Sequence, residues 1–590
     1  MNTQKIINKI KLYPLTKILL NTILVILFFI LCLFIFKDIA HPLIWNDESE
    51  TVMTSTQILK FGYPKVHDGK NMIFLPDDPT MIGYQEDLDV NITTTWGGYY
   101  FGTIGVFLAN FTDNIYFKTA LVRLPFAIIG LLALIIFILS IKHSFTNTKI
   151  FKLFACFFII LELFSISLIL NLREARYYSL TIFFTACFLF LFIKYFIQHK
   201  YSYKKYFVLM SIVLFLTYNT NLLIFVILCG TLTANILIYY IFNYSYVLKD
   251  ESNVLAHLKI ISQKIFMAAL PIFVVGILIT PIVFFFDTFS SAARATEYYQ
   301  FPNGYTDNLK RIFFYLSHFE FLYTAIAVKI VLLASWITIK IKCKTDYWLK
   351  EIKKRKFSQL YQVSTLLISF LIIYLLVIAK MPSALLWMRH YVGMQPLLVL
   401  MILIDLYIIY KYIRLTIPIK YRFATLCLFY TVLSIFFIIN SQNKIPFVQE
   451  YVYQINHQLE GPLDHIIPYL KENFEDIENM TIATNYEGLS YVYYLNNKHL
   501  TPFPLEKTSE YLAESPDILI YRKMWGYSPN EFNHFLTKAE YSRVSFPVFD
   551  SPTNNITELL SQRHWLLDHR FRTAYTDDES QKTDIYIKQE

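Results

Sequence analysis

Runs of apolar side chains, most of them close to twenty residues long, dominate the first 440 residues. A helix of about twenty residues is long enough to cross the roughly 30 Å hydrocarbon core of a membrane. The pattern therefore predicts an α-helical polytopic membrane protein with about eleven transmembrane helices. We expect these spans at 17–36, 119–141, 151–170, 177–197, 206–220, 221–243, 264–286, 321–341, 359–379, 390–410 and 421–440.

The pattern changes after residue 440 and becomes typical of a soluble α/β domain. Residues 461–474 have helical periodicity, and 487–495 predict a second helix. Short apolar runs predict strands at 480–485, 517–522, 544–550 and 584–588. The chain thus divides into a transmembrane domain, 1–440, and a soluble domain, 441–590. The soluble domain contains no G-x-G-x-x-G and no Walker loop, so nucleotide binding is not indicated.

Composition supports the membrane assignment, and charge orients the chain. Hydrophobic residues make up 55% of the sequence and charged residues only 16%, against about a quarter in soluble proteins. The net charge of +9 gathers before the first span and in loops that fall on one side of the membrane, namely 142–152, 194–205, 340–356 and 411–422. Basic loops face the cytoplasm. Because topology accounts for the positive charge, no nucleic-acid partner is expected.

The opposite side receives the first outer loop, 37–118, and everything after residue 440. We therefore expect a multi-pass protein of the cytoplasmic (inner) membrane, with a cytoplasmic N-terminus and a periplasmic or extracellular C-terminal domain. Residues 97–111 are also apolar, but a crossing there would move the basic loop 142–152 outside. They are interpreted as an interfacial or re-entrant helix of the first outer loop.

Three acidic residues, Asp47, Glu48 and Glu50, follow the first span at the outer edge of the membrane. They open a predicted helix that ends near Gly62. Acidic residues in a first helical turn are stabilised by the helix dipole, so a capped surface helix is one interpretation. The other is a cluster of catalytic carboxylates.

Two further charged segments lie at the outer ends of predicted spans. Arg173, Glu174, Arg176 and Tyr177 occupy a short turn between two spans, and Arg389, His390 and Tyr391 stand just before a late one. Charges close to the hydrocarbon require partners or a function. The structural alternatives are an Arg–Glu pair that caps a helical hairpin and basic residues that anchor a helix at the interface.

All three segments fall on the same side of the membrane in a topology that rests on unrelated basic loops. An arginine that faces inward there can bind phosphate. A carboxylate beside it can take a proton from an attacking hydroxyl or amine. The combination favours transfer of a sugar from a lipid phosphate.

These residues carry a resemblance to the GT-C class of glycosyltransferases. The chain most resembles family 39, which includes the protein O-mannosyltransferases and the lipid A aminoarabinose transferase. The resemblance rests on an ordered set of short motifs that covers nearly the whole chain: Asp47-Glu48, Arg123-Leu124-Pro125, the stretch from Arg173 to Tyr178, and Arg389-His390-Tyr391 followed by Gln395-Pro396. A soluble α/β tail after the last span is also common in that family.

The resemblance implies an inverting transfer of a hexosyl or pentosyl group from a polyprenyl-phosphate donor to a lipid, glycan, protein or cell-wall acceptor. It implies Asp47 as catalytic base with Glu48 beside it, and Glu174 in the same cavity. It further implies that Arg173, Arg176 and Arg389 bind the donor phosphate, with the cavity lined by Tyr177, His390 and Tyr391.

The chain departs from the family in the first outer loop, where a Lys-Pro-Pro stretch is often found. Here residues 89–96 read DVNITTTW, so contacts to donor or acceptor are expected to differ. No cofactor is required by the sequence. The loop also holds five acids whose oxygens suit a divalent cation, at spacings too permissive to decide for or against one: Asp77, Asp78, Glu86, Asp87 and Asp89.

Two other functions remain open at this point. A transporter or flippase for a lipid-linked sugar would be expected to have pseudo-symmetric halves with broken helices near the midplane, and no matching halves are visible. A non-catalytic polysaccharide-assembly protein would use 441–590 as its working part.

Overall fold

The structure is a computed structural model in which most of the chain can be described. The described residues are 3–73, 83–145, 147–244, 254–289, 304–318, 320–342, 355–381, 388–442, 444–458, 460–500, 515–523, 529–550 and 575–589.

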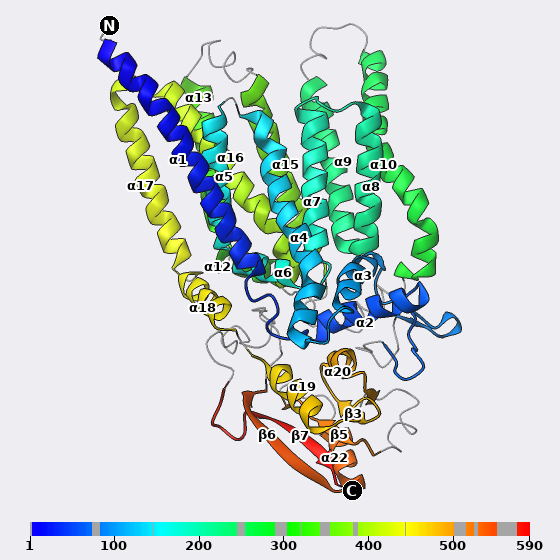
Figure 1. Ribbon diagram of the computed structural model, residues 1–590. Coiled ribbons are helices and arrows are strands. Elements are labelled where there is room, and N and C mark those ends of the chain that lie inside the picture. Colours follow the sequence, from blue (N-terminus) through cyan, green and yellow to red (C-terminus); the bar gives the residue numbers. More distant parts are fainter. Residues whose placement is uncertain are drawn as a thin grey trace.

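A bundle of long helices forms the larger part of the molecule (Figure 1). Among the described residues, eight helices are long and apolar enough to cross a membrane. They are α1 (Thr3–Phe36), α4 (Ile115–Ile141), α7 (Tyr178–Phe192), α9 (Leu222–Tyr244), α10 (Val254–Phe285), α15 (Arg355–Ile378), α16 (Gln395–Thr416) and α17 (Ile419–Ser441). The predicted class of α-helical membrane protein is confirmed.

The number of spans differs from the prediction. All eleven predicted runs lie on helices, but α8 (Tyr203–Thr220) is not among the helices long and apolar enough to be a span. Two sharply bent pairs raise the number in the described chain from eight to at most ten. These pairs are α5 (Thr148–Leu163) with α6 (Ile166–Arg173), and α12 (Tyr305–His318) with α13 (Leu322–Lys342).

The predicted span 151–170 is a bent pair of helices, because α6 turns away from α5 by 81°. The break follows from polar side chains that find partners on other helices. Ser165 Oγ donates to the Gln395 side-chain oxygen at 2.6 Å, and Ser167 Oγ donates to Glu320 at 3.0 Å. Gln395 begins α16 and Glu320 lies at the α12–α13 joint, so two distant segments fix the bend.

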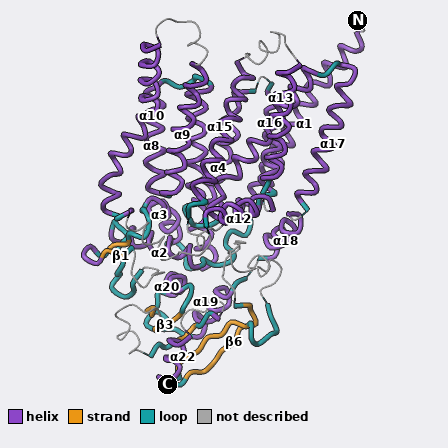
Figure 2. Tube along the Cα trace, turned by 180° about the vertical axis from the view of Figure 1, so that it is seen from behind, coloured by secondary structure: helices purple, strands orange, loops and turns teal. Residues whose placement is uncertain are grey.

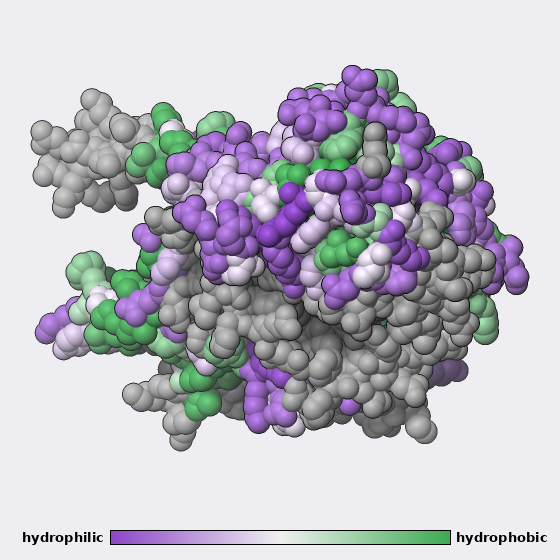
Figure 3. All heavy atoms as spheres, turned by 90° about the horizontal axis from the view of Figure 1, so that it is seen from below, coloured by the Kyte–Doolittle hydropathy of each residue, from purple (hydrophilic) through white to green (hydrophobic). Residues whose placement is uncertain are grey.

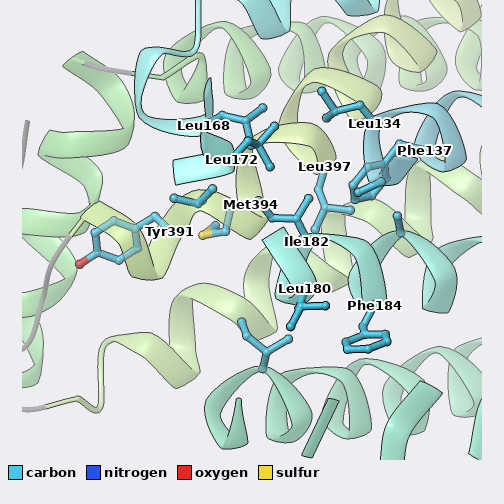
Figure 4. Packing of buried hydrophobic residues seen from close by; sticks show 14 of the residues in the cluster. Leu134, Phe137, Leu168, Leu172, Leu180, Ile182, Phe184, Tyr391, Met394 and Leu397 are labelled. Atoms are coloured by element: carbon cyan, nitrogen blue, oxygen red, sulfur yellow. The ribbon is translucent and has the colours of Figure 1, made fainter. Parts of the chain in front are cut away.

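Apolar side chains fill the bundle and cover its outside. Figure 4 shows Leu134 and Phe137 of α4 packed near Leu168, Ile182 and Leu397 of three neighbouring helices. Large apolar side chains also point outward from the helices, among them Ile277, Phe284, Phe423 and Leu428. Lipid contact explains such a surface, since apolar patches of this extent are rare on soluble proteins.

Two shorter helices lie across one end of the bundle, at the level of α6 (Figures 1 and 2). These are α2 (Asn46–Phe61) and α3 (Gly97–Ala109), both present where the sequence predicts them. Gly62 ends α2 in the left-handed conformation, with φ of 85°. A Cβ on Gly102 of α3 would lie 2.4 Å from Ser55 Oγ, so glycine permits the close packing of α3 on α2. A short hairpin, β1 (Tyr84–Gln85) and β2 (Val90–Asn91), precedes α3.

The C-terminal part forms a mixed sheet with helices, on the same side of the bundle as α2 and α3 (Figure 1). After α18 (Lys444–His457), the sheet has the order β4-β3-β5-β7-β6. The pairs of β3 with β4 and β5 are parallel, whereas β7 pairs antiparallel with β5 and β6. The elements are α19 (Pro462–Asn473), β3 (Thr481–Thr484), α20 (Gly488–Leu495), β4 (Lys498–Leu500), β5 (Ile518–Ile520), α22 (Pro529–Lys538), β6 (Tyr541–Phe549) and β7 (Lys582–Lys588).

The sequence correctly predicted α19, α20, β3, β5, β6 and β7, but not β4 or α22. The described surface of this part is largely hydrophilic when seen from below, with scattered apolar side chains (Figure 3). Such a surface is consistent with exposure to water.

Candidate active site

Helix α2 presents its acidic residues to two different environments. Asp47 and Glu50 are three residues apart and lie on one face of the helix, while Glu48 is rotated by about 100°. Glu48 is fully buried, and Asp47 and Glu50 are only half-buried. The three acids therefore form two separate clusters.

The half-buried cluster brings together residues from four parts of the chain. The Asp47 carboxylate accepts a short hydrogen bond from Arg389 Nη1, and Arg176 Nη2 lies 3.8 Å from the same oxygen. Arg176 also donates to Glu50 at 2.8 Å and to the Asp47 carbonyl at 2.6 Å. Tyr99 of α3 completes the group by donating to Glu50 at 2.7 Å.

Charge balance in this cluster favours an ionised Asp47. Burial alone would raise the pKa of Asp47, but Arg389 and Arg176 outweigh it, so the pKa is lowered. Burial alone would lower the pKa of Arg176, whereas Glu50 and Asp47 raise it well above the usual value. Two carboxylates and two guanidinium groups thus face each other in this cluster.

Part of this cluster is still available to a ligand. The Asp47 and Arg389 side chains keep 20% and 14% of their surface exposed. The Nε–H of Arg176 is buried and has no acceptor among the described residues. The Tyr177 ring lies 5.5 Å from the Arg176 guanidinium.

The second cluster is a buried ion pair between Glu48 and Arg123 of α4. Arg123 Nε donates to Glu48 at 2.8 Å, and the same carboxylate accepts from the Ala175 amide at 2.8 Å. The Arg123 guanidinium also donates to backbone carbonyls just before α2. Glu48 therefore forms a buried structural contact, and it is not part of the half-buried cluster that contains Asp47. Sequence reasoning did not assign Arg123 a role, although an arginine inside an apolar run indicates a buried partner.

Glu174 and Arg173 form hydrogen bonds with residues outside the Asp47 cluster. Glu174 is buried and accepts a hydrogen bond from Trp45 Nε1 at 2.9 Å. Arg173 donates to the carbonyls of Phe34 and Lys37 at the end of α1, at 3.1 and 2.7 Å. The structure brings Asp47, Arg176 and Arg389 together, but it does not bring Arg173 to them.

The turn η6 (Met388–Met394) positions Arg389 and separates its neighbours. His390 is half-buried, and its carbonyl accepts from the Tyr374 hydroxyl at 2.9 Å. Tyr391 is buried beside Tyr315, with 6.3 Å between ring centroids, and lies at the edge of the group of side chains shown in Figure 4. Tyr391 thus contributes to packing around the turn.

The acidic first outer loop is only partly described. Asp77 and Asp78 lie outside the described residues. Asp89 interacts with His67 at 2.6 Å and with Lys65 at 3.9 Å. Over the described ranges, no group of three or more His, Cys, Asp or Glu side chains could hold a metal ion.

The arrangement as a whole defines a helical membrane protein with a charged, half-exposed cluster between its bundle and a C-terminal mixed sheet. No family model and no curated protein matches the sequence. Two solved structures of ArnT from Cupriavidus metallidurans, one in the apo state and one bound to undecaprenyl phosphate, are similar over 96% of this chain and 97% of theirs. The sequence identities are 11% and 12%, with TM-scores of 0.46 and 0.44.

Proposed function

We propose that this protein is a glycosyltransferase that uses a polyprenyl-phosphate sugar donor at the outer face of the cytoplasmic membrane. The observation that carries the proposal is the ionised, half-exposed Asp47 held between Arg389 and Arg176. A carboxylate and two arginines at the end of a membrane bundle supply the base and the anion-binding groups that this transfer requires.

Arg389 and Arg176 are proposed to bind the donor phosphate. Both guanidinium groups already contact carboxylates, and a phosphate in the same place would compete for their N–H groups. The Nε–H of Arg176, which lacks an acceptor among the described residues, supports this role. Movement of Arg389 toward the phosphate would release Asp47 from its ion pair and make it a stronger base.

Asp47 is proposed to act as the base in a single inverting displacement. The acceptor oxygen or nitrogen forms a bond to the anomeric carbon as the bond from that carbon to the phosphate oxygen breaks. The acceptor proton passes to Asp47, and the polyprenyl phosphate leaves with the bonding electron pair. The arginines stabilise the charge that develops on the leaving phosphate.

Mass spectrometry of envelope glycolipids and glycoproteins from a deletion strain would test the proposal. We expect one mass increment to disappear, to return with the wild-type protein, and to stay absent with Asp47→Asn. Asp113→Asn provides a matched control, because Asp113 is exposed and belongs to neither cluster. Recovery of the increment with Asp47→Asn would contradict the proposal.

A second measurement separates an enzyme from a transporter. Purified protein in detergent is mixed with a detergent extract of the deletion strain's envelope, in which unused donor and unmodified acceptor accumulate. An enzyme forms the product in this mixture, whereas a transporter has no membrane to act across. If folded protein forms no product in this mixture, the result would favour a transporter.

A further inference from the structure

Residues 39–45 belong to the segment that joins α1 to α2, and they end two residues before Asp47. Two of the segment's backbone carbonyls accept hydrogen bonds from a side chain of the transmembrane bundle. Arg123 Nη1 donates to the carbonyls of Ile39 and Pro42, at 2.9 and 2.7 Å. These carbonyls of the segment are therefore bound by the transmembrane helix α4.

Two backbone amides of the same segment donate hydrogen bonds to side chains of the C-terminal part. The Leu43 amide donates to Asp464 Oδ1 of α19 at 3.3 Å, and the Ile44 amide donates to the Tyr494 hydroxyl of α20 at 3.0 Å. Tyr494 also hydrogen-bonds Thr119 Oγ1 of α4. Asp464 and Tyr494 are each only 5% exposed, so water competes little for these contacts.

A separate contact joins the first outer loop to the C-terminal part of the chain. Asn71 of the first outer loop donates to the Asn497 carbonyl at 2.8 Å and accepts from the His499 amide at 2.7 Å. Figure 1 shows α20 directly against α2. The C-terminal part is thus docked on the segments that carry Asp47, and its contacts reach the backbone next to that residue.

We propose that Tyr494 and Asp464 are positioning residues for Asp47, so that the C-terminal part of the chain completes the active site. This inference rests on the proposed function of Asp47. The two side chains fix consecutive backbone amides just ahead of the first turn of α2, and that turn sets where the Asp47 carboxylate lies relative to Arg389 and Arg176. A displacement of about 1 Å can lower a rate by as much as a hundredfold.

The chain offers a matched pair of variants at adjacent positions. Tyr494→Phe removes the hydroxyl that accepts from Ile44, while Tyr493→Phe removes a hydroxyl that is buried without a hydrogen-bond partner among the described residues. Both changes keep the aromatic ring, so they differ in the hydrogen bonds that the Tyr494 hydroxyl makes with Ile44 and with Thr119. Asp464→Ala is a second variant that removes the acceptor for Leu43.

The first readout is hydrogen exchange, which does not depend on any enzyme activity. In the full-length protein in detergent, Tyr494→Phe should speed exchange at the amides of residues 43 and 44 by about threefold to tenfold, as expected for one hydrogen bond. Tyr493→Phe should leave exchange there unchanged. Equal exchange in wild type and Tyr494→Phe would overturn the proposed contact.

The second readout is product formation from the deletion-strain envelope extract, measured across pH. We expect Tyr494→Phe to lower the rate about tenfold or more, with Tyr493→Phe close to wild type. Because the arginines lower the pKa of Asp47 against the effect of burial, its displacement should also move the acidic limb of the profile to higher pH. If Tyr494 had a purely structural role, the acidic limb of the pH profile would stay at its wild-type position in Tyr494→Phe.

The outcomes distinguish the two proposals. If Asp47→Asn still forms product, the proposed function fails whatever Tyr494 does. If Asp47→Asn is inactive but Tyr494→Phe and Asp464→Ala keep both the wild-type rate and the wild-type pH profile, the positioning role is wrong and the proposed function stands.

Discussion

Adjacent carboxylates on one helix turn are expected to respond to neutralisation in opposite ways. Asp47→Asn keeps the shape of the side chain but cannot accept a proton, so transfer should fall by about 10²–10⁴ while thermal melting in detergent stays near wild type. Glu48→Gln weakens the buried pair with Arg123 and should lower the melting temperature instead. Turnover of Asp47→Asn above about a tenth of wild type would exclude it as the base.

The guanidinium groups of Arg389 and Arg176 are expected to matter for their shape as well as their charge. Lysine keeps the charge but loses the fork that binds two phosphate oxygens. Arg389→Lys and Arg176→Lys should therefore weaken donor use, and the alanine variants should abolish it. The rate is measured at limiting donor, with Arg414→Lys, at the end of α16 away from the cluster, as the control. Normal turnover of either lysine variant would make that arginine a structural residue.

At the scale of elements, the start of α2 depends on α4 through one side chain. Arg123 pairs with Glu48 and also holds the carbonyls before α2, and both partners are almost completely buried. Arg123→Ala leaves a buried carboxylate without its counter-ion, which typically costs about 3–5 kcal/mol.

A thermal melt in detergent would measure this effect. Lys310→Ala is the control, because Lys310 pairs with Asp307 on an exposed surface where such a pair contributes about 0–1 kcal/mol. Similar melting temperatures for the two variants would show that the Arg123–Glu48 pair does not stabilise the joint between α2 and α4.

Another element-scale contact is expected to make stability depend on pH. Burial raises the pKa of Asp464 to about 7, while hydrogen bonds from Gly461 and Leu43 act in the opposite direction. Unfolded Asp464 has its ordinary pKa near 3.8, so from about pH 4 to about pH 7 the unfolded chain binds fewer protons than the folded one. This residue therefore destabilises the fold increasingly as pH rises through that range. The difference in melting temperature between Asp464→Asn and wild type should shift in favour of the variant from pH 5 to pH 8, and a constant difference would contradict the assignment.

At the scale of the whole molecule, the ends of the chain lie on opposite sides of the helix bundle (Figure 1). We expect the N-terminus and the loop 340–356, most of which lies outside the described residues, to face the cytoplasm. A reagent that cannot cross the membrane should label a cysteine placed at Glu579 in spheroplasts, because that side chain is 71% exposed. It should not label native Cys343. The reverse pattern would put Asp47 on the cytoplasmic side and end the functional proposal.

The helices of the bundle were predictable from the sequence because the length of an apolar run is a local property. The same holds for α2 and α3 and for most strands of the C-terminal sheet, whose periodicity lies within a few residues. The break between α5 and α6 was not predictable, since its partners Glu320 and Gln395 come from other parts of the chain.

The sequence by itself determined which charged residues stand at the ends of spans, because charges interrupt apolar runs. Only the tertiary structure decided how they pair. Asp47 meets Arg389 from more than three hundred residues away, whereas its neighbour Glu48 meets Arg123. These choices depend on how the helices pack and on which face of α2 is buried, and neither can be read from residue order. The contacts of Leu43 and Ile44 with the C-terminal part also depend on the tertiary structure. Every residue except proline has a backbone amide, so the sequence does not show which amides will find partners on distant elements.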